Sequence, residues 1–207
     1  DLQALLALMR ERGAQAVAIE VSSHAMAMSR ADALRFDVVA FLNLGRDHLD
    51  FHRDMEEYFE AKASLFTPEH ARAAVVWIDD ENGCRVADRA RKAGLPVTTV
   101  GTREEADYRL MGYEPVLPLG GRARLRTASG ETTVELALPG WHNMVDAAIA
   151  LAMLERVGIS VKDVLPGLAR AQVPGRMQVL PLPEMAPTVV VDFAHTPQAV
   201  AATPVSY

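Results

Sequence analysis

Three polar residues, Glu20, Asn43 and Asp192, directly follow runs of apolar residues. The runs before Glu20 and Asn43 cover residues 16–19 and 36–42. Continuous apolar runs of this length are typical of buried strands, and ligands in open α/β sheets bind beyond the carboxyl ends of the strands. Strand ends also meet solvent, so a single polar residue there is as consistent with an ordinary surface residue as with a binding site. Ser, His, Arg and Asp residues cluster after Glu20 and Asn43, and this clustering favours a site.

Lys62 is the second candidate for chemistry, because it falls on the apolar face of a helix predicted over residues 55–66. Apolar side chains stand three, four and seven residues away on the same face. A lysine there must extend to solvent, pair with a carboxylate or lose its charge, since a buried lone ammonium is costly. Alternatively, the amine reacts with carbon dioxide and becomes an anionic carbamate, whose oxygens suit Mg²⁺.

Glu20, His48 and carbamylated Lys62 are the candidate metal ligands. A magnesium site wants one or two acidic oxygens together with phosphates and waters, and Glu20 and the carbamate would supply such oxygens. His48 would add a nitrogen, which is an unusual ligand for Mg²⁺, and a histidine is more often structural. The spacing alone is therefore a moderate indication of a metal site.

Composition excludes several classes of protein. The net charge of −6 provides no basic stripe for nucleic acid. No apolar run approaches the ~20 residues that cross a bilayer, and the start has no leader pattern, so we expect a cytoplasmic protein without membrane insertion. Cys84 is the only cysteine, which excludes an intrachain disulfide and fits a reducing compartment.

The elements that must position these residues predict an α/β fold, with a mostly parallel sheet flanked by helices. The expected strands cover 16–19, 36–42, 73–78 and 96–100. The expected helices cover 2–10, 55–66, 81–93, 141–157 and 161–171. Alternating residues and glycine turns between 107 and 138 predict a small antiparallel subsheet.

A domain boundary is expected at the sequence VPGR (173–176), which breaks the helical pattern. Residues 1–172 would form one domain. Residues 173–207 would form a hinge and the first strand, at 188–191, of a C-terminal α/β domain.

The order and spacing of several motifs resemble the Mur ligases, and the forms EVSSH and NLGRDHLDFH look like the MurE-type members. The motifs are EVSSH (20–24), NLGRDHLDFH (43–52), YFEAKASLF (58–66), DDENG (79–83), GWHN (140–143), VPGR (173–176) and VDFAHTP (191–197). Each motif is short and unspecific, but the combination covers essentially the whole chain and is highly specific.

The resemblance implies the central ATP-binding domain of a ligase. Such an enzyme phosphorylates a carboxylate of UDP-N-acetylmuramoyl-L-alanyl-D-glutamate with ATP, and the amine of the third amino acid of the peptidoglycan peptide then attacks the acyl phosphate. The family implies Mg²⁺ as cofactor and a monomer. In the family, the positions of Glu20, His48 and carbamylated Lys62 serve the metal and phosphate region.

Further roles are implied by the same resemblance. Ser22, Ser23 and Arg30 match positions that contact the UDP-linked substrate. The positions that contact ATP are matched by His142, Asn143, Arg176 and Asp192. Asp146 stands where the family has a second Asn, which puts the nucleotide contact there in question.

Two departures from the family concern activity. No phosphate-binding loop ending in Gly-Lys-Thr or Gly-Lys-Ser occurs in the sequence, and only the beginning of a third domain is expected, so we expect the chain alone to be inactive. The alternatives are a non-catalytic Mur-like domain that binds UDP-muramoyl-peptide, and another Mur-type or folylpolyglutamate-type ligase. The identity of the added amino acid stays open.

Overall fold

The computed structural model describes residues 2–45, 50–116, 120–180, 189–195 and 200–201 of the chain. Its helices are α1 (Leu2–Glu11), α2 (Ser23–Ala27), α3 (Met55–Ala63), α4 (Glu81–Lys92), α5 (Trp141–Arg156) and α6 (Val161–Leu168). Its strands are β1 (Val39–Phe41), β2 (Ala74–Trp77), β3 (Val97–Gly101), β4 (Tyr108–Pro115), β5 (Gly121–Thr127), β6 (Gly130–Leu136), β7 (Gln178–Val179) and β8 (Val190–Val191).

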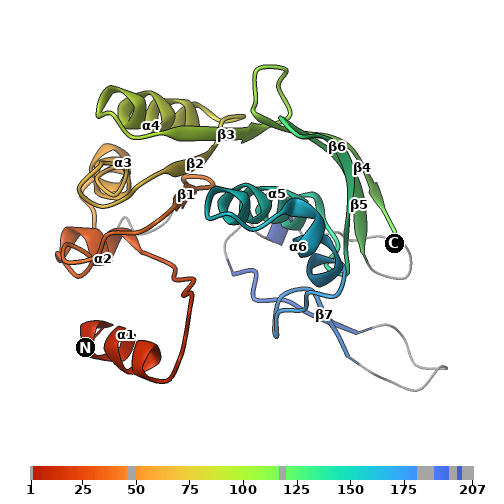
Figure 1. Ribbon diagram of the computed structural model, residues 1–207, viewed down its shortest axis with the longest axis horizontal. Coiled ribbons are helices and arrows are strands. Elements are labelled where there is room, and N and C mark those ends of the chain that lie inside the picture. The colour runs from red at the N-terminus through yellow and green to blue at the C-terminus, as the bar shows by residue number, and fades with distance from the viewer. Residues whose placement is uncertain (1, 46–49, 117–119, 181–188, 196–199, 202–207) are drawn as a thin grey trace.

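Strands β1 to β6 form one sheet in sequence order (Figure 1). β1 to β4 pair in parallel, whereas β4, β5 and β6 pair antiparallel and continue the same sheet. β7 and β8 form a separate antiparallel pair. This arrangement confirms the prediction of a mostly parallel sheet with an antiparallel extension.

Helices cover both faces of the sheet. Successive residues of a strand point to opposite faces, so neighbouring residues of one strand enter two different cores. Ala74 and Val76 of β2 belong to the core shared with α3 and α4, whereas Val75 between them belongs to the core shared with α5 and α6. The residues of α5 that face the sheet include Met144 and Leu151, which are fully buried. Near-continuous apolar strands are therefore explained by burial on both faces.

The predicted strand at 16–19 is not formed, and this prediction was wrong. Residues 14–22 run without strand pairing between α1 and α2, and Val17 and Ile19 are 46% and 41% exposed. Among the described residues β1 pairs with β2 alone, so its other edge has no strand beside it. An apolar run becomes a strand only where another strand completes its hydrogen bonds.

The other boundaries differ from prediction by a few residues. β1 is shorter than the predicted 36–42, and Phe36 makes only an isolated bridge to Ala71. α6 ends at Leu168 and contains Pro166 in its last turn. The partner of β8, strand β7, was not predicted. None of the described helices combines the length and apolar character needed to cross a membrane.

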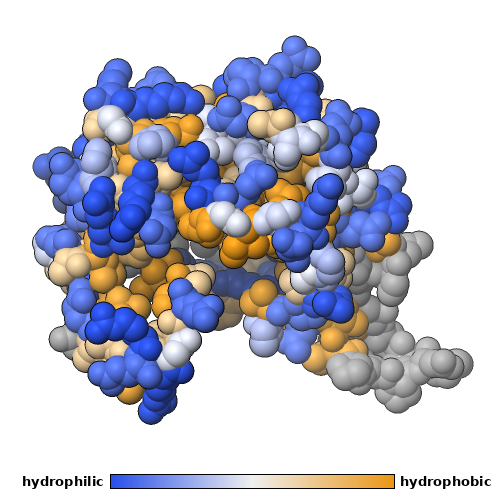
Figure 2. Space-filling view, viewed as in Figure 1, coloured by the Kyte–Doolittle hydropathy of each residue, from blue (hydrophilic) through white to orange (hydrophobic). Residues whose placement is uncertain are grey.

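Apolar residues also reach the surface on one face of the molecule. Figure 2 shows them gathered near α1 and over α5, with a hollow between the two groups. The exposed apolar side chains of α1 include Leu5 and Leu8.

Candidate functional site

Helix α3 carries Lys62 and is fixed at its start by a pair of side-chain caps. The Asp54 carboxylate accepts a hydrogen bond from the Glu57 N–H at 2.8 Å, and the Glu57 carboxylate accepts one from the Arg53 N–H at 3.0 Å. These bonds satisfy main-chain donors that have no partner within the helix. Ion pairs of Glu56 and Glu60 with arginines of α4 join the two helices. The helix is thus positioned at its start and along its exposed side.

The Lys62 amine is partly buried, with its Nζ 5.4 Å from the centroid of the Tyr58 ring. Burial lowers its pKa, and the nearby negative charge of Glu20 opposes that shift. Glu20 itself is exposed. The two groups therefore lie near enough to interact electrostatically, although they are 42 positions apart in the chain. Partial burial increases the fraction of neutral amine, which is the form that reacts with carbon dioxide.

Ser23 occupies a different environment from the one that substrate contact requires. Its side chain is buried, at 1% exposure, and its Oγ lies 2.9 Å from Nε2 of His52, which is equally buried. A small molecule at the surface cannot reach this hydroxyl. Ser23 would therefore act on a substrate only through its neighbours.

Ser22 and Arg30 lie nearer to solvent. The Ser22 hydroxyl caps α2 by accepting a hydrogen bond from the Ala25 N–H at 3.2 Å, and its side chain remains exposed. Arg30 lines a pocket of about 440 Å³ together with Glu20 and apolar side chains that include Ile19 and Leu34. A guanidinium next to apolar walls suits the carboxylate or phosphate of a ligand that also has an apolar part.

The start of α5 forms the second group of candidate residues. Gly140 has φ of +99°, and a Cβ there would lie 2.7 Å from Cε1 of His142, so the close approach of the imidazole requires glycine. The Gly140 N–H donates to the Tyr113 hydroxyl at 2.8 Å, and the Asn143 amide donates to the Pro139 carbonyl at 2.6 Å. His142 remains exposed.

Asp146 lies one turn after His142 on α5. Burial raises the pKa of its carboxyl, and His142 opposes that shift. The Asp146 side chain is exposed at the surface. The same surface carries Trp141, which packs edge-on against Trp77 at the end of β2.

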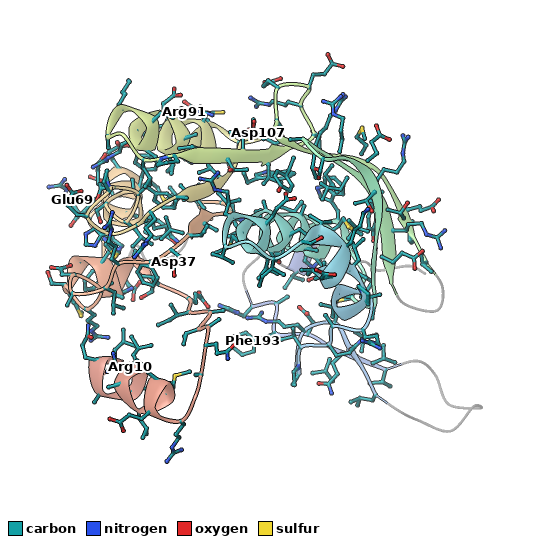
Figure 3. The ribbon with its side chains drawn as sticks, in the orientation of Figure 1. Arg10, Asp37, Glu69, Arg91, Asp107 and Phe193 are labelled. Carbon is teal, nitrogen blue, oxygen red and sulfur yellow. The ribbon has the colours of Figure 1, made fainter. Side chains whose placement is uncertain are left out.

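The third group forms the turn around VPGR. The Asp192 carboxylate accepts hydrogen bonds from the main-chain N–H of Met177 and of Ala194, both at 2.8 Å. The Arg176 guanidinium lies over the Phe193 ring, 5.1 Å from its centroid. In Figure 3, Phe193 lies below α5. Asp192 and Arg176 therefore hold the turn against β8, and the predicted contacts of both residues with ATP stay predictions.

The predicted residues thus gather in three groups: Glu20, Ser22, Arg30 and Lys62; His142 and Asn143; and Arg176 and Asp192. His48 lies outside the described residues. Within the described ranges no three His, Cys, Asp or Glu side chains come together to hold a metal. Glu20 with an unmodified lysine offers one hard oxygen group beside a cation, so the pair fits Mg²⁺ only after Lys62 carries a carbamate.

Two residues beside the first group were not selected as site residues from the sequence. His52 closes the motif NLGRDHLDFH, and Tyr58 is one of the apolar residues on the same helical face as Lys62, four residues before it. The motif signalled that His52 matters but not what it contacts. The helical spacing placed Tyr58 on the face of the lysine, and the structure shows the contact between its ring and the Lys62 amine.

Comparison with known proteins matches this chain to the Mur ligases by family model, by sequence and by structure. The family model described as the Mur ligase middle domain matches residues 1–154. A UDP-N-acetylmuramoyl-L-alanyl-D-glutamate–2,6-diaminopimelate ligase of Streptomyces coelicolor is 42% identical over 205 residues, covering 97% of this chain and 39% of the relative. A UDP-N-acetylmuramyl-tripeptide synthetase of Leifsonia xyli is 39% identical over 212 residues, covering 98% and 40%.

Among solved structures, a UDP-N-acetylmuramoyl-L-alanyl-D-glutamate–2,6-diaminopimelate ligase superposes with a TM-score of 0.84 at 32% identity. The match covers 96% of this chain and 41% of that one. The chain therefore spans about two fifths of the length of the relatives it matches.

Proposed function

The chain belongs to the Mur ligase family, and on that premise we propose that it is the central part of an ATP-dependent ligase that adds the third amino acid to UDP-N-acetylmuramoyl-L-alanyl-D-glutamate. The observation that carries this proposal is the match, over nearly the whole chain, to relatives named for that activity. The amino acid named for the Streptomyces relative is 2,6-diaminopimelate.

The reaction has two steps. A carboxylate oxygen of the UDP-linked dipeptide attacks the γ-phosphorus of ATP, which gives an acyl phosphate and ADP. The amine of the incoming amino acid then attacks the acyl carbon, phosphate leaves, and the amine loses a proton as the amide forms. Since both substrates are polyanions, the protein must offset their charge and hold them in line.

Lys62 and Glu20 would act at the phosphates. The neutral Lys62 amine forms a bond to the carbon of carbon dioxide and releases one proton, so that the side chain becomes a carbamate. This carbamate, Glu20 and His48 would hold Mg²⁺, which when bound offsets phosphate charge. The lowered pKa of Lys62 supports the proposal, because it favours the neutral amine at a given pH.

Ser22 and Arg30 would hold the UDP-linked substrate. The Arg30 guanidinium can pair with a carboxylate or phosphate through two parallel hydrogen bonds. Glu20 lines the same pocket as Arg30, so a substrate held by Arg30 would lie beside the proposed phosphate region. Ser23, being buried, would support Ser22 and would not touch the substrate.

His142 and Asn143 would lie near the adenine of ATP, and Arg176 and Asp192 would reach its phosphate and ribose. The last two are engaged in the turn described above, so this role requires that turn to rearrange. We further propose that the ligase works as a monomer in the cytoplasm, where ATP is available.

The test is a chimera in which this chain replaces the matching segment of the Streptomyces coelicolor ligase. We expect phosphate release that depends on both UDP-N-acetylmuramoyl-L-alanyl-D-glutamate and 2,6-diaminopimelate. Lys62→Arg should lower kcat by about a hundredfold or more, because guanidinium keeps its charge and does not form a carbamate. Lys92→Arg, at the exposed end of α4, is the matched control and should leave kcat unchanged.

A folded chimera without phosphate release would contradict the ligase proposal. In that case the chain alone, titrated with UDP-N-acetylmuramoyl-L-alanyl-D-glutamate by calorimetry, distinguishes a binding domain from a domain without this ligand. If the Lys62→Arg variant is as active as its parent, the proposed carbamate is wrong but the ligase proposal is not affected.

A further inference from the structure

The buried imidazole of His52 lies between the two chain segments that carry Glu20 and Lys62. His52 precedes α3 by three residues and is 2% exposed. It neither reaches the surface nor takes part in the proposed reaction. A polar ring at such a place must have partners, because an unpaired buried polar group is costly.

On one side, the partner is Ser23 at the first turn of α2. Nε2 of His52 and Oγ of Ser23 are 2.9 Å apart, and both side chains are buried. Ser23 directly follows Ser22, which caps α2, and lies three residues after Glu20. The hydrogen bond therefore fixes the segment from which Glu20 and Ser22 project.

On the other side, the partner is helix α3. The His52 ring stacks on the Tyr58 ring with centroids 5.3 Å apart and planes 26° from parallel. Tyr58 in turn contacts the amine of Lys62. Phe51 and His24 complete the ring cluster, with centroids 4.8 Å and 5.7 Å from that of His52. One imidazole thus contacts both segments through packing and a hydrogen bond.

We propose that His52 is a positioning residue that holds the Glu20–Ser22 segment at a fixed place opposite Lys62. The proposal rests on the ligase function proposed above, for which Glu20 and Ser22 must face the substrates. Removal of either partner of this hydrogen bond leaves the other one buried and unpaired, so the segment shifts or opens to let water in. A misplacement of about 1 Å is enough to impair a reaction that depends on alignment.

The kinetic test uses the chimera with four variants. His52→Phe keeps the ring stack and removes the hydrogen bond, and Ser23→Ala removes the same bond from the other side. We expect each to raise KM for the UDP-linked dipeptide, or to lower kcat, by about tenfold. The double variant should be no worse than either single variant, since both remove one interaction. His52→Gln keeps a polar partner for Ser23 and should recover to within about threefold.

The control is His70→Phe, at a histidine outside the ring cluster in the turn before β2. It should change neither constant. A structural role for His52 alone would lower the melting temperature and the fraction of active enzyme, while KM and kcat per folded molecule stayed constant. That result would overturn the proposal, as would full additivity of the two single variants.

A second measurement on the chain itself does not depend on activity. Amide hydrogen exchange at residues 20–25 should become about tenfold faster in His52→Phe and Ser23→Ala than in the parent, with α4 unchanged. If the parent chimera is inactive but this exchange responds, the ligase proposal fails and the positioning role stands. If α4 and residues 20–25 respond equally, His52 only packs the core and the proposal is wrong.

Discussion

Helices α1 and α3 have similar lengths and opposite relations to the core. α1 is rich in leucine, yet none of its residues is buried, and Leu5 is 52% exposed. α3 has three glutamates and a lysine, yet it buries Tyr58, Phe59 and Ala63. The more apolar helix is the more exposed one. Apolar content therefore shows which surface needs a partner, whereas the fold decides whether a partner is there.

The same contrast separates the segments beside the two helices. Residues 14–22, after α1, carry the apolar run that was expected to be a strand but do not pair with the sheet. Residues 51–54, before α3, are mostly polar but are held by the His52 bond and the Asp54 cap. Each of the following changes tests whether contacts outside the helix, and not its composition, account for the difference.

The largest expected effect is that of Phe59→Ala. Phe59 is 3% exposed, packs in the core with α4, and has the Arg85 guanidinium 3.8 Å from its ring centroid. Its removal leaves a cavity and should lower the free energy of unfolding by about 3–5 kcal/mol, measured in urea. Leu5→Ala in α1 is the matched control and should change it by less than about 0.5 kcal/mol. Equal effects would remove the contrast between the helices.

Asp54→Ala should have a smaller effect. It deletes the side-chain cap of α3 and should lower the free energy of unfolding by about 1 kcal/mol. Ser160→Ala serves as control, because Ser160 stands at the same position of α6 but makes no cap bond with its side chain. Urea denaturation of both variants checks this. A loss at Ser160 as large as that at Asp54 would contradict the cap assignment.

The smallest expected effect concerns the pH dependence of stability at Lys62. Burial places the folded-state pKa of Lys62 below its unfolded value of 10.5, so the unfolded chain binds more protons between these two values. The parent should therefore gain stability relative to Lys62→Met as pH rises through that window. Urea denaturation at pH 7 and pH 10, in buffer free of carbon dioxide, measures the difference. For Lys92→Met, at an exposed lysine, the difference in the free energy of unfolding between parent and variant should be the same at both pH values. If the same holds for Lys62→Met, the Lys62 ammonium is solvated and the prediction is wrong.

Sequence periodicity predicted helices α3 to α6 and the parallel order of β1 to β3, because apolar spacing is a local property. It did not predict the short helix α2, although Ser23 and Met26 of that helix are buried. It failed at 16–19, where a strand depends on a neighbour, and it missed β7, which has only two residues. Motif matching selected Ser23 as a substrate contact. The structure buries that residue, and the sequence carries no direct signal of burial for a serine between a serine and a histidine.

The sequence by itself determined the family, the α/β pattern and the identity of the residues available for chemistry. Only the tertiary structure decided which of them meet. The Ser23–His52 hydrogen bond spans 29 positions and the interaction of Glu20 with Lys62 spans 42, while Asp192 is engaged by main-chain N–H groups that have no sequence signature. Such contacts follow from the packing of whole elements, and no spacing along the chain encodes them.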